Sequence, residues 1–284
     1  MVPLTYINMT AAVLLLNVMT AYAAEQADNI VIGIAPFLPV KTLVQNYAPL
    51  RDFLELKLNE HVTIVSAPDY QTYYKRIQKH DYQIIITTAN SAYVSSTDYA
   101  YIPLLQPLKL THPVVVIGKD KKLTNLIELR SKTIAMSDAT AIVSMQGMQM
   151  LRDFGLQPGH DVTVKNLQNH SAAVNYVITG EVDAAIVADR ALMQMPATTK
   201  DQVKIVYTWK QGASPGIVYM GNPDMPSDKL KLIKYAILEF VRNTPEGEKM
   251  MLDTGYGDLI PVKPDDLNAL APYGILLKES LSEK

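Results

Sequence analysis

Cysteine is absent from the 284 residues of this chain. The absence excludes disulfide bonds, thiolate metal sites, a cysteine nucleophile and a lipid-bearing cysteine after an export signal. Glycine is also sparse, with 13 residues, and neither a P-loop nor the GxGxxG pattern of dinucleotide-binding folds occurs. The GxSxG turn that presents a serine nucleophile is missing too. The sequence therefore lacks the common signatures of nucleotide-dependent, serine and cysteine enzymes.

Neither sign of charge dominates the chain. The formal net charge is -2 at pH 7, which leaves no basic surface of the kind that binds a phosphate backbone, so we expect no nucleic-acid partner. None of the five histidines has the i, i+4 spacing of a helical zinc site, so we expect no metal and no cofactor. The carboxylate pairs Asp265-Asp266 and Glu181 with Asp183 fall at predicted helix starts and turns, where solvated charge is the simpler interpretation. We expect no enzymatic activity.

The N-terminal segment has the pattern of an export signal. An apolar run from Met9 to Met19 precedes Ala21-Tyr22-Ala23, two small residues around a bulky one, which predicts a signal peptide over residues 1–23. The first basic side chain is Lys41, so only the amino terminus is positive before the apolar run, and an uncleaved anchor is the alternative. We predict a soluble, periplasmic mature chain that begins at Ala24.

Short β-branched runs alternate with amphipathic stretches from Asn29 onward. Near-continuous apolar runs are typical of strands that are buried on both faces. Alternation of strands and helices predicts an α/β fold. The predicted strands are IVIGIA (30–35), VTIVS (62–66), QIIITT (83–88), PVVVIG (113–118), KTIAM (132–136), AAIVA (184–188) and VKIVY (203–207).

Helices are predicted between and after these strands. Pro49 lies within a run of leucines at helical spacing, and should kink that helix or start a new one. The last third of the chain has no strong strand signal. The other predicted helices are 141–154, ending at Gly155; 172–179, with Ser171 as N-cap and Gly180 as stop; and 227–243, 246–253 and 265–270.

No linker rich in proline, glycine or serine marks a domain boundary, so two lobes would have to be joined by strands. Two segments are candidates to cross between lobes, Pro107 to Val116 and Trp209 to Tyr219. The second contains Gly212, Ser214, Pro215 and Gly216, and has the backbone freedom that a hinge uses.

Polar and aromatic residues follow three of the predicted strands. In open α/β sheets, ligands bind beyond the carboxyl ends of strands, often against a helix N-terminus. For Thr88, Asn90, Ser91 and Thr140, a helix cap and a ligand contact are alternative interpretations, because one side chain can serve either purpose. The segments that could present amides, hydroxyls or a ring are Pro36-Phe37, Ala89-Asn90-Ser91-Ala92-Tyr93 and Ser137-Asp138-Ala139-Thr140-Ala141.

Two further side chains are candidates. Tyr93 lies in a tyrosine-dense region, and it alone of these tyrosines has a motif reason to face a cleft. His170 stands before a predicted helix and could donate to an anion; an ordinary surface histidine is the alternative.

Six segments in order resemble the PhnD-like periplasmic binding proteins of ABC importers, which bind phosphate, phosphite and phosphonate. The resemblance covers essentially the whole mature chain. The segments are Tyr47-Ala48-Pro49-Leu50 with Asp52-Phe53-Leu54, Asp69-Tyr70, residues 81–85 with Tyr93-Val94, residues 126–129 with 132–135, Asn169-His170-Ser171 with residues 180–185, and residues 243–247.

The resemblance implies the type II periplasmic-binding-protein fold, an α/β fold with two lobes joined by two crossover segments. The first lobe would comprise residues 24–112 and 214–284, and the second lobe residues 113–213. The implied function is capture of a small ligand, most simply a phosphonate or related oxyanion, for a membrane permease by a monomer without catalysis. A sensor subunit that docks on a membrane histidine kinase is an alternative role.

In this family, a Ser-Thr-Ser-Gly-like run at a helix N-terminus holds the oxyanion of the ligand. The corresponding run here is Thr140-Ala141-Ile142-Val143, and only Thr140 keeps a hydroxyl. Asp138 would repel a dianion, so a cationic or neutral ligand is an alternative, whereas His170 matches the ligand-facing histidine of the family. The predicted ligand-binding residues are Phe37, Thr88, Asn90, Ser91, Tyr93, Asp138, Thr140, Ala141 and His170.

Overall fold

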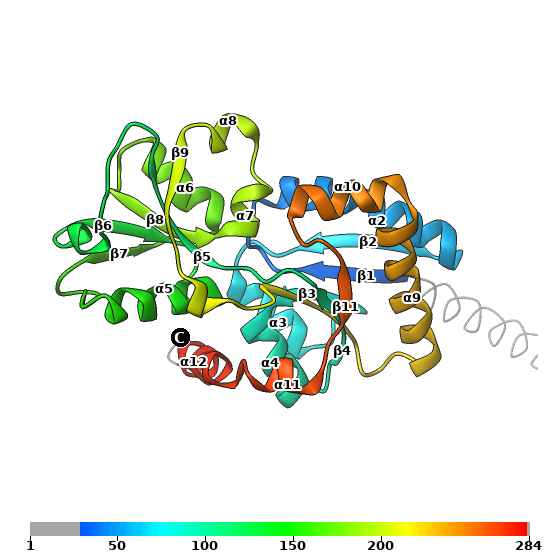
Figure 1. Cartoon of the computed structure of the whole chain (residues 1–284). Helices are drawn as coiled ribbons and strands as arrows, with labels where there is room; N and C mark the ends of the chain where they lie inside the picture. The colour runs from blue at the N-terminus through cyan, green and yellow to red at the C-terminus, as the bar shows by residue number, and fades with distance from the viewer. Residues whose placement is uncertain (1–28, 283–284) are drawn as a thin grey trace, which may run out of the picture.

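Two sheets, each enclosed by helices, make up the part of the chain that the computed structural model describes, residues 29–282 (Figure 1). One sheet has six strands in the order β11-β4-β10-β3-β1-β2, and the other has five in the order β7-β6-β8-β5-β9. This two-lobed α/β architecture is the predicted fold class. The predicted signal peptide and its cleavage site before Ala24 lie outside the described residues.

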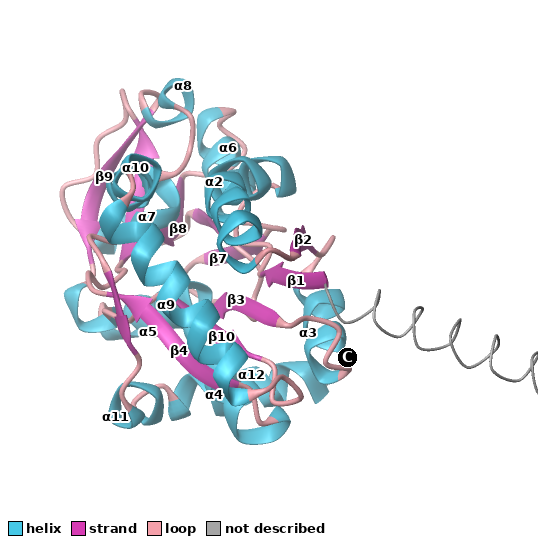
Figure 2. Ribbon diagram, turned by 90° about the vertical axis from the view of Figure 1, so that its right-hand side faces the viewer, coloured by secondary structure: helices cyan, strands magenta, loops and turns pink. Residues whose placement is uncertain are grey.

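The first lobe contains the six-stranded sheet. β1 pairs in parallel with β2 and β3, whereas β10 runs antiparallel between β3 and β4. All five residues of β3 are buried, because helices cover both faces of the sheet (Figure 2). The strands are β1 (Asn29–Ile34), β2 (His61–Ser66), β3 (Ile84–Thr88), β4 (Ile102–Pro107), β10 (Ile217–Gly221) and β11 (Leu259–Pro261). The helices are α2 (Val40–Leu58), α3 (Tyr70–Gln78), α4 (Ala89–Tyr99), α9 (Ser227–Asn243), α10 (Pro245–Thr254), α11 (Pro264–Asn268) and α12 (Ala271–Ser282).

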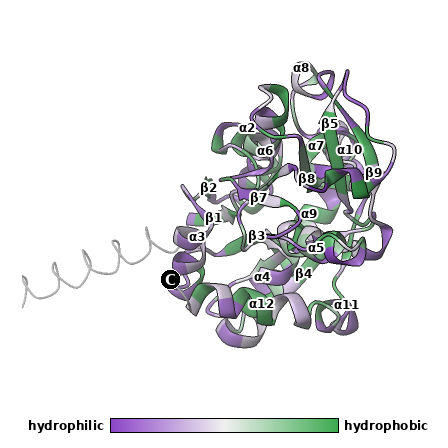
Figure 3. Ribbon diagram, turned by 90° about the vertical axis from the view of Figure 1, so that its left-hand side faces the viewer, coloured by the Kyte–Doolittle hydropathy of each residue, from purple (hydrophilic) through white to green (hydrophobic). Residues whose placement is uncertain are grey.

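The second lobe contains the five-stranded sheet. β6 pairs in parallel with β7 and β8, and β5 pairs antiparallel with β8 and β9. Its strands are β5 (Pro113–Gly118), β6 (Thr133–Met136), β7 (Thr163–Asn166), β8 (Ala184–Ala188) and β9 (Val203–Thr208). Its helices are η1 (Leu126–Leu129), α5 (Ile142–Asp153), α6 (His170–Ile178), α7 (Asp189–Met193), α8 (Ala197–Lys200) and η2 (Lys210–Gly212). The apolar residues gather on the strands inside both lobes (Figure 3).

Several predicted element boundaries need correction. Pro49 lies inside α2 and does not start a new helix. α6 begins at His170 and not at Ala172, because Asn169 and not Ser171 is the N-cap: its side chain accepts a hydrogen bond from the Ala172 amide at 3.0 Å. The last third also holds β11, a three-residue edge strand, and α12, neither of which the sequence pattern predicted.

The chain crosses between the lobes twice, from β4 to β5 and from β9 to β10. The two crossing segments pair at Thr111 and Ser214, whose backbones exchange hydrogen bonds of 2.7 and 3.0 Å. Gly216 follows at φ +76°, and a Cβ there would lie 2.3 Å from the Thr111 hydroxyl oxygen. Glycine is therefore required at this point of the two-stranded hinge.

No helix among residues 29–282 is long and apolar enough to cross a membrane. Within the same residues, no group of three or more histidine, aspartate or glutamate side chains is placed to hold a metal ion.

Candidate functional site

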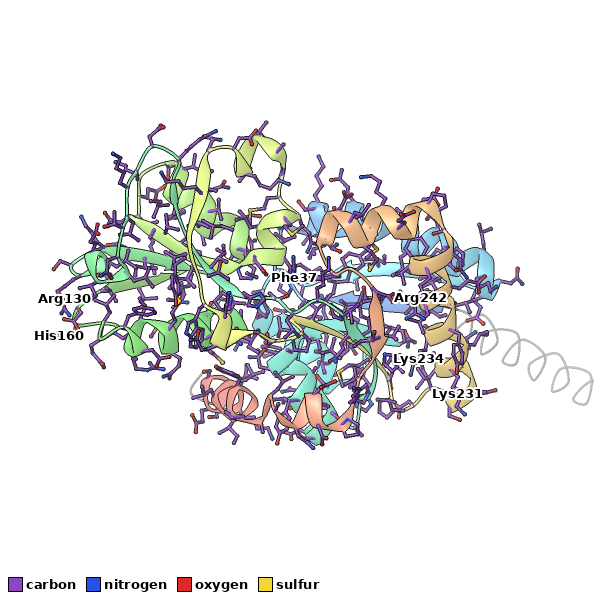
Figure 4. All side chains as sticks on the ribbon, viewed as in Figure 1. Phe37, Arg130, His160, Lys231, Lys234 and Arg242 are labelled. Atoms are coloured by element: carbon purple, nitrogen blue, oxygen red, sulfur yellow. The ribbon has the colours of Figure 1, made fainter. Side chains whose placement is uncertain are left out.

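Strands of both lobes end at a cavity between the lobes. β1 leads to Phe37, which lies at the junction of the lobes (Figure 4). β3 ends at Thr88, and β8 ends at Ala188. The starts of α5 and α6 complete the wall, so the cavity lies beyond the carboxyl ends of parallel strands, where α/β folds bind ligands. The lining consists of Phe37, Thr88, Thr111, Ala141, Ile142, Val143, His170, Ala188, Arg190, Ala191, Gln194, Gly216, Ile217 and Tyr256.

Three buried polar atoms of this lining have no hydrogen-bond partner among the described residues. They are Thr88 Oγ1 from the first lobe, and His170 Nδ1 and Arg190 Nε from the second. Thr88 is the N-cap residue of α4, yet its side chain makes no capping hydrogen bond. Because buried polar groups in native proteins are almost always paired, these three atoms indicate a place where a polar ligand binds.

His170 is buried, and burial lowers the pKa of its imidazole from 6.5 to about 4. The ring is therefore neutral at pH 7, with one nitrogen able to donate a hydrogen bond and the other able to accept one. His170 can recognise a polar group of a ligand, but it supplies no positive charge.

Arg190 is the one lysine or arginine in the cavity lining within residues 29–282. Its Nη2 donates to the Leu110 carbonyl at 3.3 Å, and its Nη1 lies 3.3 Å from Met193 Sδ. Its Nε is 4.0 Å from the nearer carboxylate oxygen of Asp189, beyond hydrogen-bond distance. The guanidinium thus retains donors that a ligand can use.

The start of α5 differs from an open oxyanion site. Asp138 Oδ1 accepts from the Thr140 amide at 2.8 Å and from the Thr140 hydroxyl at 2.5 Å. Ala141 is the N-cap and makes no side-chain cap, while the apolar side chains of Ile142 and Val143 line the cavity. The only hydroxyl of this run is therefore engaged within the protein.

The structure brings four of the nine predicted residues to the cavity: Phe37, Thr88, Ala141 and His170. Asp138 and Thr140 bond to each other beside the start of α5. Asn90 and Ser91 are buried at the start of α4, where Asn90 Nδ2 donates to the Thr140 carbonyl at 2.9 Å and Ser91 Oγ accepts from Thr87 at 2.8 Å.

Tyr93 lies away from the cavity. A Cβ on Gly274 of α12 would be 2.2 Å from its ring, so the half-buried Tyr93 packs against α12. Sequence reasoning also missed Thr111, Arg190, Gln194 and Tyr256. Arg190 was detectable, because it follows the predicted strand 184–188 by two residues, whereas Tyr256 reaches the cavity only through the tertiary return of the C-terminal segment.

Hydrogen bonds join the two lobes around this cavity. The His170 amide donates to the Phe37 carbonyl at 3.2 Å, and Gln168 Nε2 donates to the Pro68 carbonyl at 2.6 Å. Asn90 adds the bond to Thr140 already described. The free space inside this cavity is about 30 Å³, room for about one water molecule, whereas the groove outside it has about 870 Å³. The lobes are therefore closed, and a ligand larger than water must enter with the lobes further apart.

Two α/β lobes joined by a two-stranded hinge, with polar atoms from both facing a central cavity, define a solute-binding protein that closes over its ligand. Residues 32–267 match the family model described as the periplasmic substrate-binding protein of phosphonate ABC transporters. The chain belongs to this family. Its members bind solutes and are not enzymes, as the sequence predicted.

Solved structures share this fold. PhnD1 from Prochlorococcus marinus in complex with methylphosphonate is similar with a TM-score of 0.77 and 12% identity, over 88% of this chain and 98% of that one. A binding protein component of an ABC phosphonate transporter from Pseudomonas aeruginosa has a TM-score of 0.75 and 15% identity, over 88% of this chain and 86% of that one. The aliphatic sulphonate binding protein SsuA from Escherichia coli has a TM-score of 0.61 and 12% identity, over 89% of this chain and 87% of that one. No curated protein sequence matches the chain significantly.

Proposed function

We propose that this protein captures a small oxyanion, most simply an alkylphosphonate, in the cavity between its lobes and delivers it to the permease of an ABC importer as a monomer. The proposal rests mainly on the three unpaired polar atoms that converge on the cavity, Thr88 Oγ1, His170 Nδ1 and Arg190 Nε. They come from both lobes, so one ligand that bonds to all three stabilises the closed arrangement over the open one.

Each of these groups suits an oxygen-rich anion. The Thr88 hydroxyl and one His170 nitrogen can donate neutral hydrogen bonds, and Arg190 can donate charged ones. The remaining lining is largely apolar, as in Phe37 and Ile217, and can enclose the substituent of a phosphonate.

The first test is thermal unfolding of the mature chain from Ala24 with methylphosphonate, aminoethylphosphonate, phosphite, phosphate and sulfate. A ligand at 100 times its Kd should add about 2.7 kcal/mol and raise the midpoint. Thr88→Val should bind about tenfold more weakly, since it removes one donor, yet unfold at the same or a slightly higher temperature, since a buried unpaired hydroxyl is lost.

Thr63→Val, on β2 outside the cavity lining, is the matched control and should bind as the original protein does. The proposal fails if no oxyanion of the series raises the midpoint, or if Thr88→Val binds with unchanged affinity.

A further inference from the structure

Arg190 places a positive charge where the two lobes and the hinge meet. It lies on α7, two residues beyond β8, and its side chain is 19% exposed. Its bond to the Leu110 carbonyl reaches the crossover segment, and it lines both the inner cavity and the larger groove outside it. A ligand that passes from the groove into the cavity therefore meets this guanidinium.

No second cation supports Arg190 in the cavity lining of the described residues. His170 is the other basic residue there, and burial keeps it neutral at pH 7 by lowering its pKa to about 4. The neighbouring Asp189 is already engaged: it accepts from the amides of His112 at 3.0 Å and Arg190 at 2.7 Å. The Asp189 carboxylate also lies 4.0 Å from Arg190 Nε and offsets part of the guanidinium charge, so the cavity offers a ligand at most one positive charge.

The start of α5 does not favour a second negative charge on the ligand. At the start of α5, Asp138 holds the Thr140 hydroxyl, and its own carboxylate raises the pKa values of the buried Tyr70 and Tyr74, after the larger effect of burial. Ile142 contributes only methyl and methylene groups to the lining. An unpaired second charge on the ligand would be desolvated here without a partner, which is unfavourable.

We propose that Arg190 is the charge partner of the ligand, and that the cavity selects a tetrahedral oxyanion with a single negative charge and an apolar substituent. This inference rests on the proposed function, and it names the charge state that the site accepts. Two classes of ligand have this charge and shape. They are an alkylphosphonate that keeps one proton and an alkylsulfonate, which is a monoanion throughout the neutral range.

The test compares methylphosphonate and methanesulfonate by calorimetry at about pH 5.5 and about pH 8.5. Raising the pH removes the second proton of methylphosphonate but leaves methanesulfonate unchanged. The affinity for methylphosphonate should therefore fall relative to the affinity for methanesulfonate, by about tenfold for each pH unit above the second pKa of methylphosphonate. The ionisable groups near Arg190 are Asp189, His112, His170, Lys200, Asp253 and Tyr256. Because both ligands bind as monoanions under this proposal, the effect of these groups on binding cancels in the ratio.

Variants of Arg190 test the charge itself. Arg190→Gln should weaken the binding of both monoanions by about tenfold to a hundredfold, because a charge-assisted hydrogen bond is lost. Arg190→Lys keeps the charge and should recover part of the affinity, which a purely structural role would not allow. Lys204→Gln, an exposed cation of the outer groove, is the control and should change the affinity by less than about twofold.

The outcomes separate this inference from the proposed function. If methylphosphonate binds equally well or better at the higher pH relative to methanesulfonate, the selection of a monoanion is wrong, although oxyanion binding stands. Affinities of Arg190→Gln within about twofold of the original protein also overturn it. If neither ligand binds at either pH, this inference fails; the proposed function fails with it only if no oxyanion of the thermal-unfolding series binds either.

Discussion

His170 shows how burial sets the chemistry of a single residue. Its ring has a pKa of about 4 in the folded protein and an ordinary value near 6.5 when the chain is unfolded. Between these two values the unfolded chain binds a proton that the folded protein does not, so stability falls as the pH drops through this window. The original protein should lose about 2 kcal/mol more than His170→Asn between pH 7 and pH 5.

Urea unfolding of both proteins at the two pH values measures this difference, because all other titrating groups are common to both. Equal pH dependence in the two proteins would mean that His170 is not held neutral by burial.

The candidate site could be predicted from the sequence only where a residue follows a strand. Phe37, Thr88 and Ala141 were found by this rule, and His170 was a candidate from its place before a predicted helix and from the family resemblance. The rule also applies to Arg190, which follows β8, but no local pattern indicates that a short helix turns its guanidinium into the cavity. Tyr93 was predicted to face the cavity but packs against α12. The end of a strand predicts where the next helix starts, but it does not predict which face of that helix packs against a distant helix.

At the scale of elements, apolar runs located strands that are buried on both faces, such as β3 and β8, but the sequence analysis did not predict β10, whose five residues are also buried. The short edge strand β11 does not require a long apolar run, since it pairs on one side only, with β4. α12 depends on packing against α4 and α5, a tertiary contact that periodicity does not reveal.

The turn between α9 and α10 gives a physical reason for one segment of the family resemblance. Thr244 caps α10 by accepting from the Gly247 amide at 3.0 Å, and a Cβ on Gly247 would lie within 2 Å of the Phe240 carbonyl oxygen, at 1.9 Å. Gly247→Ala should therefore force α10 away from α9 and reduce the free energy of unfolding by more than about 2 kcal/mol.

Chemical denaturation measures this change. Glu246→Ala, at the neighbouring exposed position, introduces the same side chain without the contact and should stay within about 0.5 kcal/mol of the original protein. A loss for Gly247→Ala no larger than this control would show that the two helices separate at little cost.

At the scale of the whole molecule, direct contacts and not only a ligand hold the lobes together. The side-chain amide of Asn46 on α2 lies 3.4 Å from the side-chain oxygen of Gln194, the C-cap residue of α7, and Gln168 bonds to Pro68 elsewhere across the lobes. Each such neutral bond contributes up to about 1 kcal/mol to the closed arrangement. The cavity of about 30 Å³ leaves too little space for methylphosphonate, so opening must precede binding.

Removing both contacts, in the double variant Asn46→Ala with Gln168→Ala, should raise the ratio of open to closed protein by about fivefold to thirtyfold. The variant should have a larger radius of gyration by X-ray scattering without ligand, and it should bind methylphosphonate with a faster association rate, because more molecules admit the ligand at any moment.

Trp209 provides an internal reporter of this motion. It is the only tryptophan of the chain, and it lies buried on the β9–β10 crossing segment. Its amide donates to the carbonyl of Pro113, the first residue of β5 after the other crossing, at 2.9 Å. Its fluorescence should shift in the double variant and return on ligand addition. Gln149→Ala is the control, since Gln149 bonds to Asp153 within α5 and joins no lobes. Identical scattering and association rates in the double variant and this control would mean that the contacts between the lobes do not set the balance between open and closed forms.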